Sequence, residues 1–106
     1  MAATEMFQST PAIREDVIGK LRALEDELRR VGVHRLSLYG SIAKGEGDSS
    51  DVDLAIEVDP GRAPLDLLAL ERRLGDVLAY KADVVIEPVA DDYLRTKIDR
   101  HRIRIF

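Results

Sequence analysis

Residues 38–54 read LYGSIAKGEGDSSDVDL, and this stretch decides the fold. It places three glycines and four acidic residues between two apolar ends. The short alternating segment Leu36–Tyr39 predicts a β-strand that runs into the glycine-rich part. Asp51–Val58 also alternates, which predicts a second strand with its aspartates and its apolar side chains on opposite faces. The stretch therefore predicts two strands joined by a glycine-rich connection.

Periodic apolar positions outside this stretch predict the remaining elements. Ser9-Thr10-Pro11 combines a capping hydroxyl with proline in the first turn and predicts a helix start, and Asp91 can cap a later helix. The pattern predicts, besides the two strands, helices over about 10–31, 64–80 and 91–98, a strand over 82–87 and an extended segment over 102–106. This order predicts a layered α/β or α+β domain.

The composition is typical of one soluble globular domain. The 106 residues are 45% hydrophobic and 34% charged, which favours a folded chain over a disordered one. We expect a single domain over residues 1–106, with residues 1–10 as a flexible N-terminus. No apolar run has the length of a membrane span and the N-terminus has no signal-like core, so we expect a cytoplasmic protein without membrane contact.

Two further properties of the composition narrow the function. The chain has no cysteine, which excludes disulfides, thiolate metal sites and cysteine nucleophiles, so that any metal must be held by oxygen or imidazole. The formal net charge of −4 argues against strong nucleic-acid binding through phosphate neutralisation. The sequence therefore favours an oxygen-ligated site over a zinc centre or a general nucleic-acid binder.

Paired aspartates on the second strand are the first candidate site residues. Asp51 and Asp53 point to the same face of a strand, and two carboxylates about 5 Å apart repel by about 3 kcal/mol at an effective dielectric of about 20. Carboxylate oxygens beside substrate phosphate suit Mg²⁺, or alternatively Mn²⁺. Asp83 opens the third strand and can complete the set if that strand neighbours the second. Two metal ions held by three carboxylates would stabilise an in-line displacement at phosphorus, and Asp83 can orient or deprotonate an incoming hydroxyl.

The upstream half of the stretch favours phosphate binding. Gly40 and Ser41 follow a strand directly, and their small size lets the backbone approach a ligand. If Ser41–Lys44 forms a helical turn, its free amides and the serine hydroxyl can donate to an anion. The spacing fits neither the P-loop nor the dinucleotide fingerprint, so both of those classes are excluded.

The residues GSIAKGEGDSSDVDL resemble the G-S-x-A-[RK]-G-x-x-x-x-S-D-x-D-L signature of the nucleotidyltransferase superfamily that includes DNA polymerase beta, and most closely its minimal, MNT-type members. The later KADVV around Asp83 is similar to the strand that supplies the third carboxylate of this family. The resemblance covers about residues 13–106 and implies a mixed sheet with helices packed against it. It implies that Gly40 and Ser41 lie at the triphosphate, with Asp51 and Asp53 as metal ligands. It also implies that Asp83 is the third acid and the base.

Lys44 stands where these small proteins commonly carry arginine. The substitution keeps the positive charge but weakens bidentate phosphate contacts. Lys44 is therefore expected to join Gly40 and Ser41 in binding the nucleotide.

This resemblance also implies a reaction and a partner. It implies transfer of AMP from ATP to a hydroxyl, with Mg²⁺ and release of pyrophosphate. The chain has no room for a substrate domain, so a partner protein is expected to supply the acceptor. Stand-alone MNT proteins are similar to antitoxins of HEPN–MNT pairs, which implies a tyrosine of a HEPN-type toxin as acceptor. The alternatives are a noncatalytic antitoxin that acts by binding and an aminoglycoside-type enzyme that modifies a small molecule.

Several charged residues outside these motifs are interpreted as surface. Glu57 shares the face of the aspartates but lies further along the strand, at the edge of the site or in solvent. His34 and His101 have no partner at metal-ligand spacing. The basic segment 95–106 is interpreted as a solvated helix face followed by an edge strand, in preference to a role of its arginines in binding triphosphate, an acidic partner or RNA.

Overall fold

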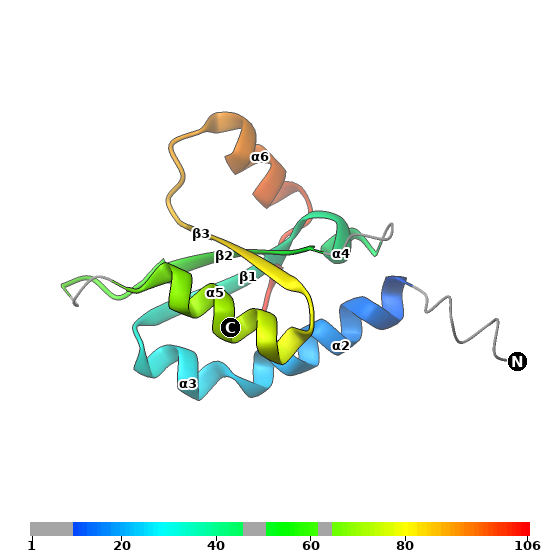
Figure 1. Cartoon of the computed structure of the whole chain (residues 1–106). Helices are drawn as coiled ribbons and strands as arrows, with labels where there is room; N and C mark the ends of the chain where they lie inside the picture. The colour runs from blue at the N-terminus through cyan, green and yellow to red at the C-terminus, as the bar shows by residue number, and fades with distance from the viewer. Residues whose placement is uncertain (1–9, 46–50, 62–64) are drawn as a thin grey trace, which may run out of the picture.

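The computed structural model describes residues 10–45, 51–61 and 65–106 and shows a four-stranded sheet flanked by helices (Figure 1). The sheet has the order β3-β2-β1-β4. Its strands are β1 (Val33–Tyr39), β2 (Asp51–Val58), β3 (Lys81–Ile86) and β4 (Ile103–Arg104). The described helices are α2 (Thr10–Ala23), α3 (Glu25–Arg30), α4 (Gly40–Lys44), α5 (Leu67–Leu78) and α6 (Asp92–Arg100).

The sheet is mixed, as the family resemblance implies. β1 pairs antiparallel with β2 and with β4, whereas β2 and β3 are parallel. A parallel pair needs a crossover connection, and α5 provides it between β2 and β3. The third predicted strand therefore neighbours the second, which was the condition for Asp83 to join Asp51 and Asp53.

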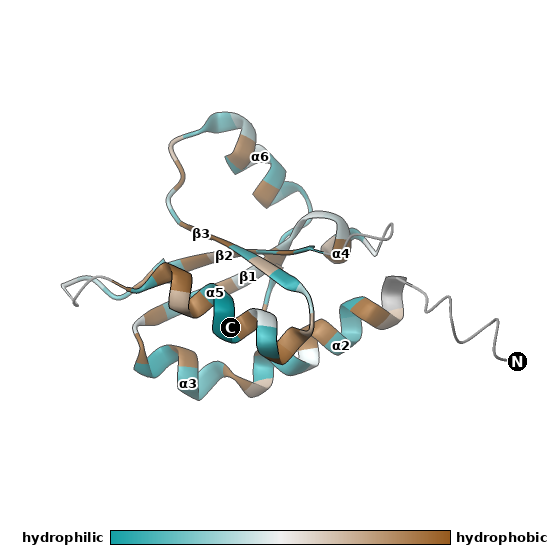
Figure 2. Cartoon of the chain, viewed as in Figure 1, coloured by the Kyte–Doolittle hydropathy of each residue, from teal (hydrophilic) through white to brown (hydrophobic). Residues whose placement is uncertain are grey.

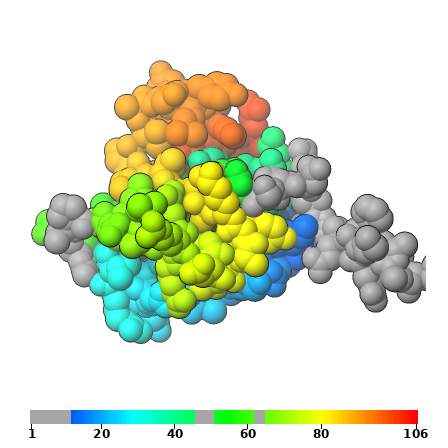
Figure 3. All heavy atoms as spheres, viewed as in Figure 1, coloured from blue at the N-terminus to red at the C-terminus, as the bar shows by residue number. Residues whose placement is uncertain are grey.

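The two faces of the sheet are covered unequally. α2, α3 and α5 lie on one side and α6 lies on the other (Figure 1). Hydrophobic residues alternate with hydrophilic ones along α2, α3 and α5, as expected for helices with one buried face (Figure 2). The main core lies on this side and includes Leu21, Leu36, Leu54 and Leu74. On the side of α6, Tyr39, Ala55 and Ile98 form a smaller buried cluster. The space-filling view shows α6 as a ridge in orange beyond β3 (Figure 3).

The first helix differs from the prediction because it is interrupted at Leu24. Leu24 has φ of −92° and ψ of 1°, and its amide donates to the carbonyl of Leu21 three residues earlier. Leu24 and Leu28 are both buried in the main core, and no glycine or proline marks this tighter turn in the sequence. The cap predicted at Ser9 and residues 1–9 of the predicted flexible N-terminus lie outside the described residues.

The other predicted elements are confirmed with small shifts at their ends. β1 begins at Val33 rather than Leu36, and α5 spans Leu67–Leu78 within the predicted range 64–80. Asp91 caps α6 by accepting hydrogen bonds from the amides of Tyr93 and Leu94. Within the part of the chain that is described, no helix combines the length and the apolar character needed to cross a membrane.

Candidate active site

The turn from β1 into α4 brings the backbone against Asp53. Gly40 has φ of 79°, in the left-handed region that disfavours residues with a Cβ. A Cβ at this position would overlap Oδ2 of Asp53 and would lie 3.2 Å from its Cγ. Glycine is therefore required here for two reasons, and the second is the carboxylate itself.

Strand pairing places the aspartates on one face of the sheet. Asp53 lies opposite Tyr39 of β1 on one side and opposite Asp83 of the parallel strand β3 on the other. Asp51 is two positions before Asp53 and therefore points to the same face. All three aspartates are partly exposed. Because Tyr39 packs with Ile98 of α6, this face is the one that α6 covers only in part.

The surroundings of Asp53 make its ionisation costly. Burial raises the pKa of Asp53, and the nearby charges of Asp83 and Asp51 raise it further, while Lys97 acts in the opposite direction. Burial raises the pKa of Tyr39 to about 12, and the charges of Asp53, Asp83 and Glu87 contribute to this increase. The site therefore carries negative charge that a cation would stabilise.

Asp83 is held in place from the side of α5. Oε2 of Glu71 accepts a hydrogen bond of 2.9 Å from the amide of Val84, at the free edge of β3. This contact fixes the strand next to Asp83, whose carboxylate also lies 3.9 Å from Nζ of Lys81. The position of the third carboxylate thus depends on the helix that connects β2 to β3.

The donor set suits a divalent cation. Asp51, Asp53 and Asp83 offer only oxygen ligands, and their accumulated negative charge is what Mg²⁺ or Mn²⁺ would neutralise. Among the residues that are described, no three histidine, aspartate or glutamate side chains already stand close enough together to enclose an ion. Remaining coordination positions would have to come from water or substrate, as is usual for Mg²⁺.

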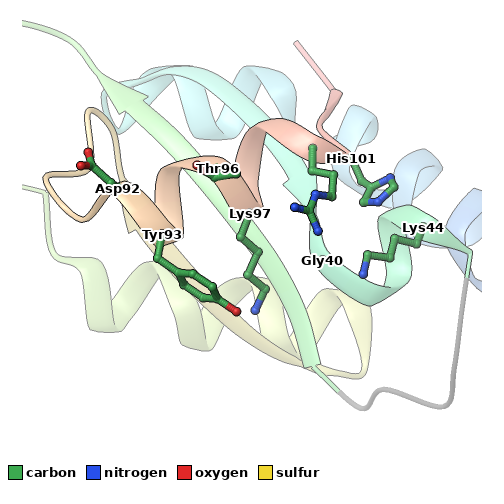
Figure 4. Close-up of a pocket in the computed structure, with 8 residues that line it drawn as sticks. Gly40, Lys44, Asp92, Tyr93, Thr96, Lys97 and His101 are labelled. Carbon is green, nitrogen blue, oxygen red and sulfur yellow. The ribbon is translucent and has the colours of Figure 1, made fainter.

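A pocket of about 450 Å³ lies beside Gly40 (Figure 4), and Asp51, Asp53 and Asp83 are not among the residues that line it. Gly40 and Lys44 line it from the α4 side, and Gly40 also touches Asp53. The remaining lining residues belong to α6 and to the residue after it: Asp92, Tyr93, Thr96, Lys97, Arg100 and His101. The pocket therefore lies between α4 and α6.

The structure brings some of the predicted site residues together and leaves others apart. Gly40 and Asp83 both lie next to Asp53, at the ends of β1, β3 and β2, and Asp51 lies two positions earlier on β2. Ser41 and Lys44 follow on the predicted helical turn, now α4, where Ser41 is partly exposed and Lys44 is exposed. Glu57 lies apart from them, 4.0 Å from Arg35 of β1.

Sequence reasoning missed the contribution of α6 to the pocket. His101 and the basic residues of this helix were interpreted as solvated surface, and they are exposed, but several of them line the pocket. The signal was available, because positions 93, 96, 97 and 100 follow helical spacing and share one face. The sequence does not show that this face lies beside Gly40, because that placement depends on how α6 folds back over the sheet.

Comparison with known proteins identifies the family. The family described as Polymerase beta, Nucleotidyltransferase matches residues 23–106. Protein adenylyltransferase MntA of Thermococcus cleftensis is 32% identical over 75 residues, which cover 69% of this chain and 76% of that protein. A proposed protein adenylyltransferase of Methanocaldococcus jannaschii is 37% identical over 70 residues, covering 61% of this chain and 75% of the relative.

Solved structures share the fold. A proposed minimal nucleotidyltransferase is 28% identical, with a TM-score of 0.64 over 91% of this chain and 95% of the other. A complex of a tri-AMPylated Shewanella oneidensis HEPN toxin with an MNT antitoxin contains a chain that is 18% identical, with a TM-score of 0.61 over 88% of this chain and 71% of the other. At that identity the second likeness concerns the fold alone. The match over residues 23–106, which covers most of the chain, shows that this protein belongs to the polymerase beta nucleotidyltransferase family.

Proposed function

We propose that this protein transfers AMP from ATP to a tyrosine hydroxyl of a HEPN-type toxin and thereby acts as its antitoxin. The observation that carries the proposal is the in-register pairing of Asp53 with Asp83 beside Gly40. The relatives named protein adenylyltransferase support protein as the class of acceptor. The fold shared with the MNT chain of a complex that contains an AMPylated HEPN toxin supports the kind of partner.

Each site residue has a role in this proposal. Asp51, Asp53 and Asp83 would hold the metal, with two Mg²⁺ ions as the expected occupancy and Mn²⁺ as a substitute. When bound, the metal supplies charge neutralisation at the reacting phosphate. Gly40 lets the backbone approach the triphosphate, the Ser41 hydroxyl can donate to it, and Lys44 contributes positive charge.

The reaction forms one bond and breaks another at the α-phosphorus. The tyrosine oxygen of the acceptor attacks, the bond between the α-phosphorus and the bridging oxygen breaks, and pyrophosphate leaves. Asp83 is the residue proposed to orient the hydroxyl and take its proton, since it lies at the edge of the sheet with its side chain 44% exposed. Most of the rate enhancement is expected to come from positioning and electrostatics.

Labelled ATP tests the transfer directly. The protein is incubated with ATP labelled at the α-phosphate, Mg²⁺ and a HEPN-type protein encoded beside it, and label is followed into that protein. Asp53→Asn is expected to reduce the rate by about 100-fold or more, because it removes a charged ligand at the reacting phosphate.

Glu57→Gln is the matched control for this experiment. It removes the same charge from the same strand face, but at a carboxylate that faces Arg35 near the surface. This variant should transfer label at close to the wild-type rate. Equal rates for Asp53→Asn and wild type would refute the proposed mechanism.

A further inference from the structure

The pocket beside Gly40 has one wall made by a single face of α6. Tyr93, Thr96, Lys97 and Arg100 all line it, while Leu94 and Ile98 of the same helix pack toward the sheet. The close-up shows Lys97 on α6 and Lys44 on α4 on either side of this pocket, with Asp92 directed away from them (Figure 4). α6 thus has an apolar face that packs toward the sheet and a polar face that lines the pocket.

The cations on this wall are not neutralised by the described part of the protein. Lys44, Lys97 and Arg100 form no ion pair with any residue in the described ranges. Their neighbours differ, because Arg95 pairs with Asp92, and Arg102 pairs with Glu87 and Asp99. Three unpaired cations around one pocket, in a chain with a net charge of −4, match a ligand that carries several negative charges.

This wall of the pocket also lies near the carboxylates. Lys97 lies close enough to Asp53 for its positive charge to act on that carboxylate. Gly40 lines the pocket and touches Asp53, so the pocket and the aspartates adjoin through one residue. A ligand that extends from the basic wall past Gly40 would meet Asp53.

Hydrogen bonds of Arg102 hold this wall of the pocket in place. Arg102, immediately after α6 and His101, donates hydrogen bonds of 2.9 and 2.6 Å to the two carboxylate oxygens of Glu87. It also donates to Asp99 and to the buried hydroxyl of Ser37. These bonds attach the end of α6 to the sheet, so its basic face is a fixed surface of the fold.

We propose that Lys97 and Arg100, on the basic face of α6, bind the phosphates of the donor nucleoside triphosphate opposite Gly40 and the aspartates. The proposal rests on the proposed function, since it names how that site takes its donor. A compact ammonium and a planar guanidinium both donate to phosphate oxygens, and a volume of about 450 Å³ lies within the range of nucleotide-sized sites.

Affinity for nucleotides of different charge tests this role. Calorimetry with Mg²⁺ compares ATP and AMP binding to wild type, Lys97→Gln, Arg100→Gln and the double variant. Each single substitution should weaken ATP binding about tenfold, because each removes charged hydrogen bonds to phosphate. AMP, which lacks the β- and γ-phosphates, should lose much less affinity.

Arg72→Gln is the matched control. Arg72 is exposed on α5, on the other side of the sheet, and its substitution removes one positive charge far from the pocket. It should leave ATP affinity unchanged, and thermal unfolding should show that all variants are folded, since the substituted side chains are exposed. Unchanged ATP affinity in the double variant, or equal losses for ATP and AMP, would overturn the proposal.

The same measurements separate this inference from the function proposed above. Selective loss of ATP affinity without any AMP transfer to a HEPN-type protein would support the phosphate site and refute the acceptor. Normal transfer by the double variant, with unchanged ATP affinity, would refute the phosphate site alone. Equal competition by an RNA oligonucleotide without a triphosphate would assign the basic face to RNA and also count against the proposal.

Discussion

At the scale of single residues, Gly40 is required both by its backbone conformation and by the position of the Asp53 carboxylate. The sequence predicts a glycine at which the backbone approaches a ligand. The structure adds that the glycine also makes room for Oδ2 of Asp53. That second role could not be predicted, because it depends on the pairing of β1 with β2 and not on local sequence.

Gly40→Ala is expected to lower the free energy of unfolding more than Gly61→Ala does. The two glycines have similar φ values of 79° and 77°, and forcing alanine into this region costs about 1–2 kcal/mol at either site. At Gly61 a Cβ meets nothing within 4 Å, whereas at Gly40 it meets Asp53. Urea unfolding of both variants measures the difference, and equal losses would show that the Asp53 side chain moves aside without cost.

Asp53 is expected to destabilise the protein at neutral pH in the absence of metal. Its pKa is raised in the folded state, so its contribution to stability is present below the unfolded pKa and is lost as the pH rises through the folded value. Asp53→Asn should therefore be more stable than wild type near pH 7, and this advantage should shrink near pH 4.

Denaturant unfolding at both pH values, without Mg²⁺, measures this effect. Glu57→Gln, on the same strand face beside Arg35, should show no comparable gain at neutral pH. An Asp53→Asn variant that is less stable than wild type near pH 7 would contradict the electrostatic explanation, because it would mean that ionised Asp53 is stabilised by its surroundings.

At the scale of elements, the strands were more predictable than the placement of the helices. β2 matches its prediction from Asp51 to Val58, since alternation over eight residues is a strong local signal. The break at Leu24 was not predictable, because only core packing distinguishes it from continuous helix. α6 was predicted as an element, but its position over the sheet depends on contacts of Arg102 with Glu87 and with the distant Ser37 of β1.

Arg102→Gln is expected to loosen α6 and weaken nucleotide binding together. It removes a bidentate ion pair in which the Arg102 and Glu87 side chains are 29% and 16% exposed, at an expected cost of about 2 kcal/mol. ATP affinity should fall as well, because α6 carries Lys97 and Arg100. Unfolding and calorimetry on the same variant check both effects.

Arg73→Gln is the control for this comparison. Arg73 makes the same bidentate contact, with Glu27 of α3, but its side chain is 52% exposed. Its loss should cost less stability and should leave ATP affinity unchanged. If Arg102→Gln behaved like Arg73→Gln, the attachment of α6 would not contribute to the nucleotide site.

At the scale of the whole molecule, the parallel pairing of β2 and β3 assembles the site. Asp53 and Asp83 are thirty residues apart in sequence and directly opposed in the sheet. The sequence offered Asp83 as a third carboxylate only on the condition that the two strands are neighbours. The acidic half of the site was therefore predictable once that condition held, whereas the basic wall required the full arrangement of α4 and α6.

In the proposed function this chain supplies the site for the nucleotide donor, and the acceptor is expected on a partner protein. Catalysis and simple binding predict different behaviour of the Asp51→Ala, Asp53→Ala double variant toward a HEPN-type toxin. Growth after co-expression should show that this variant fails to neutralise the toxin if AMP transfer is required. Full neutralisation would favour a noncatalytic antitoxin.

The mass of the partner tests AMP transfer most directly. A HEPN-type protein encoded beside this chain is purified after co-expression and its intact mass is measured. We expect an increase by one or more AMP groups on tyrosine with wild type, and an unmodified mass with Asp53→Asn. A partner that is neutralised by the wild-type protein but retains its unmodified mass would contradict the proposed adenylyltransferase function.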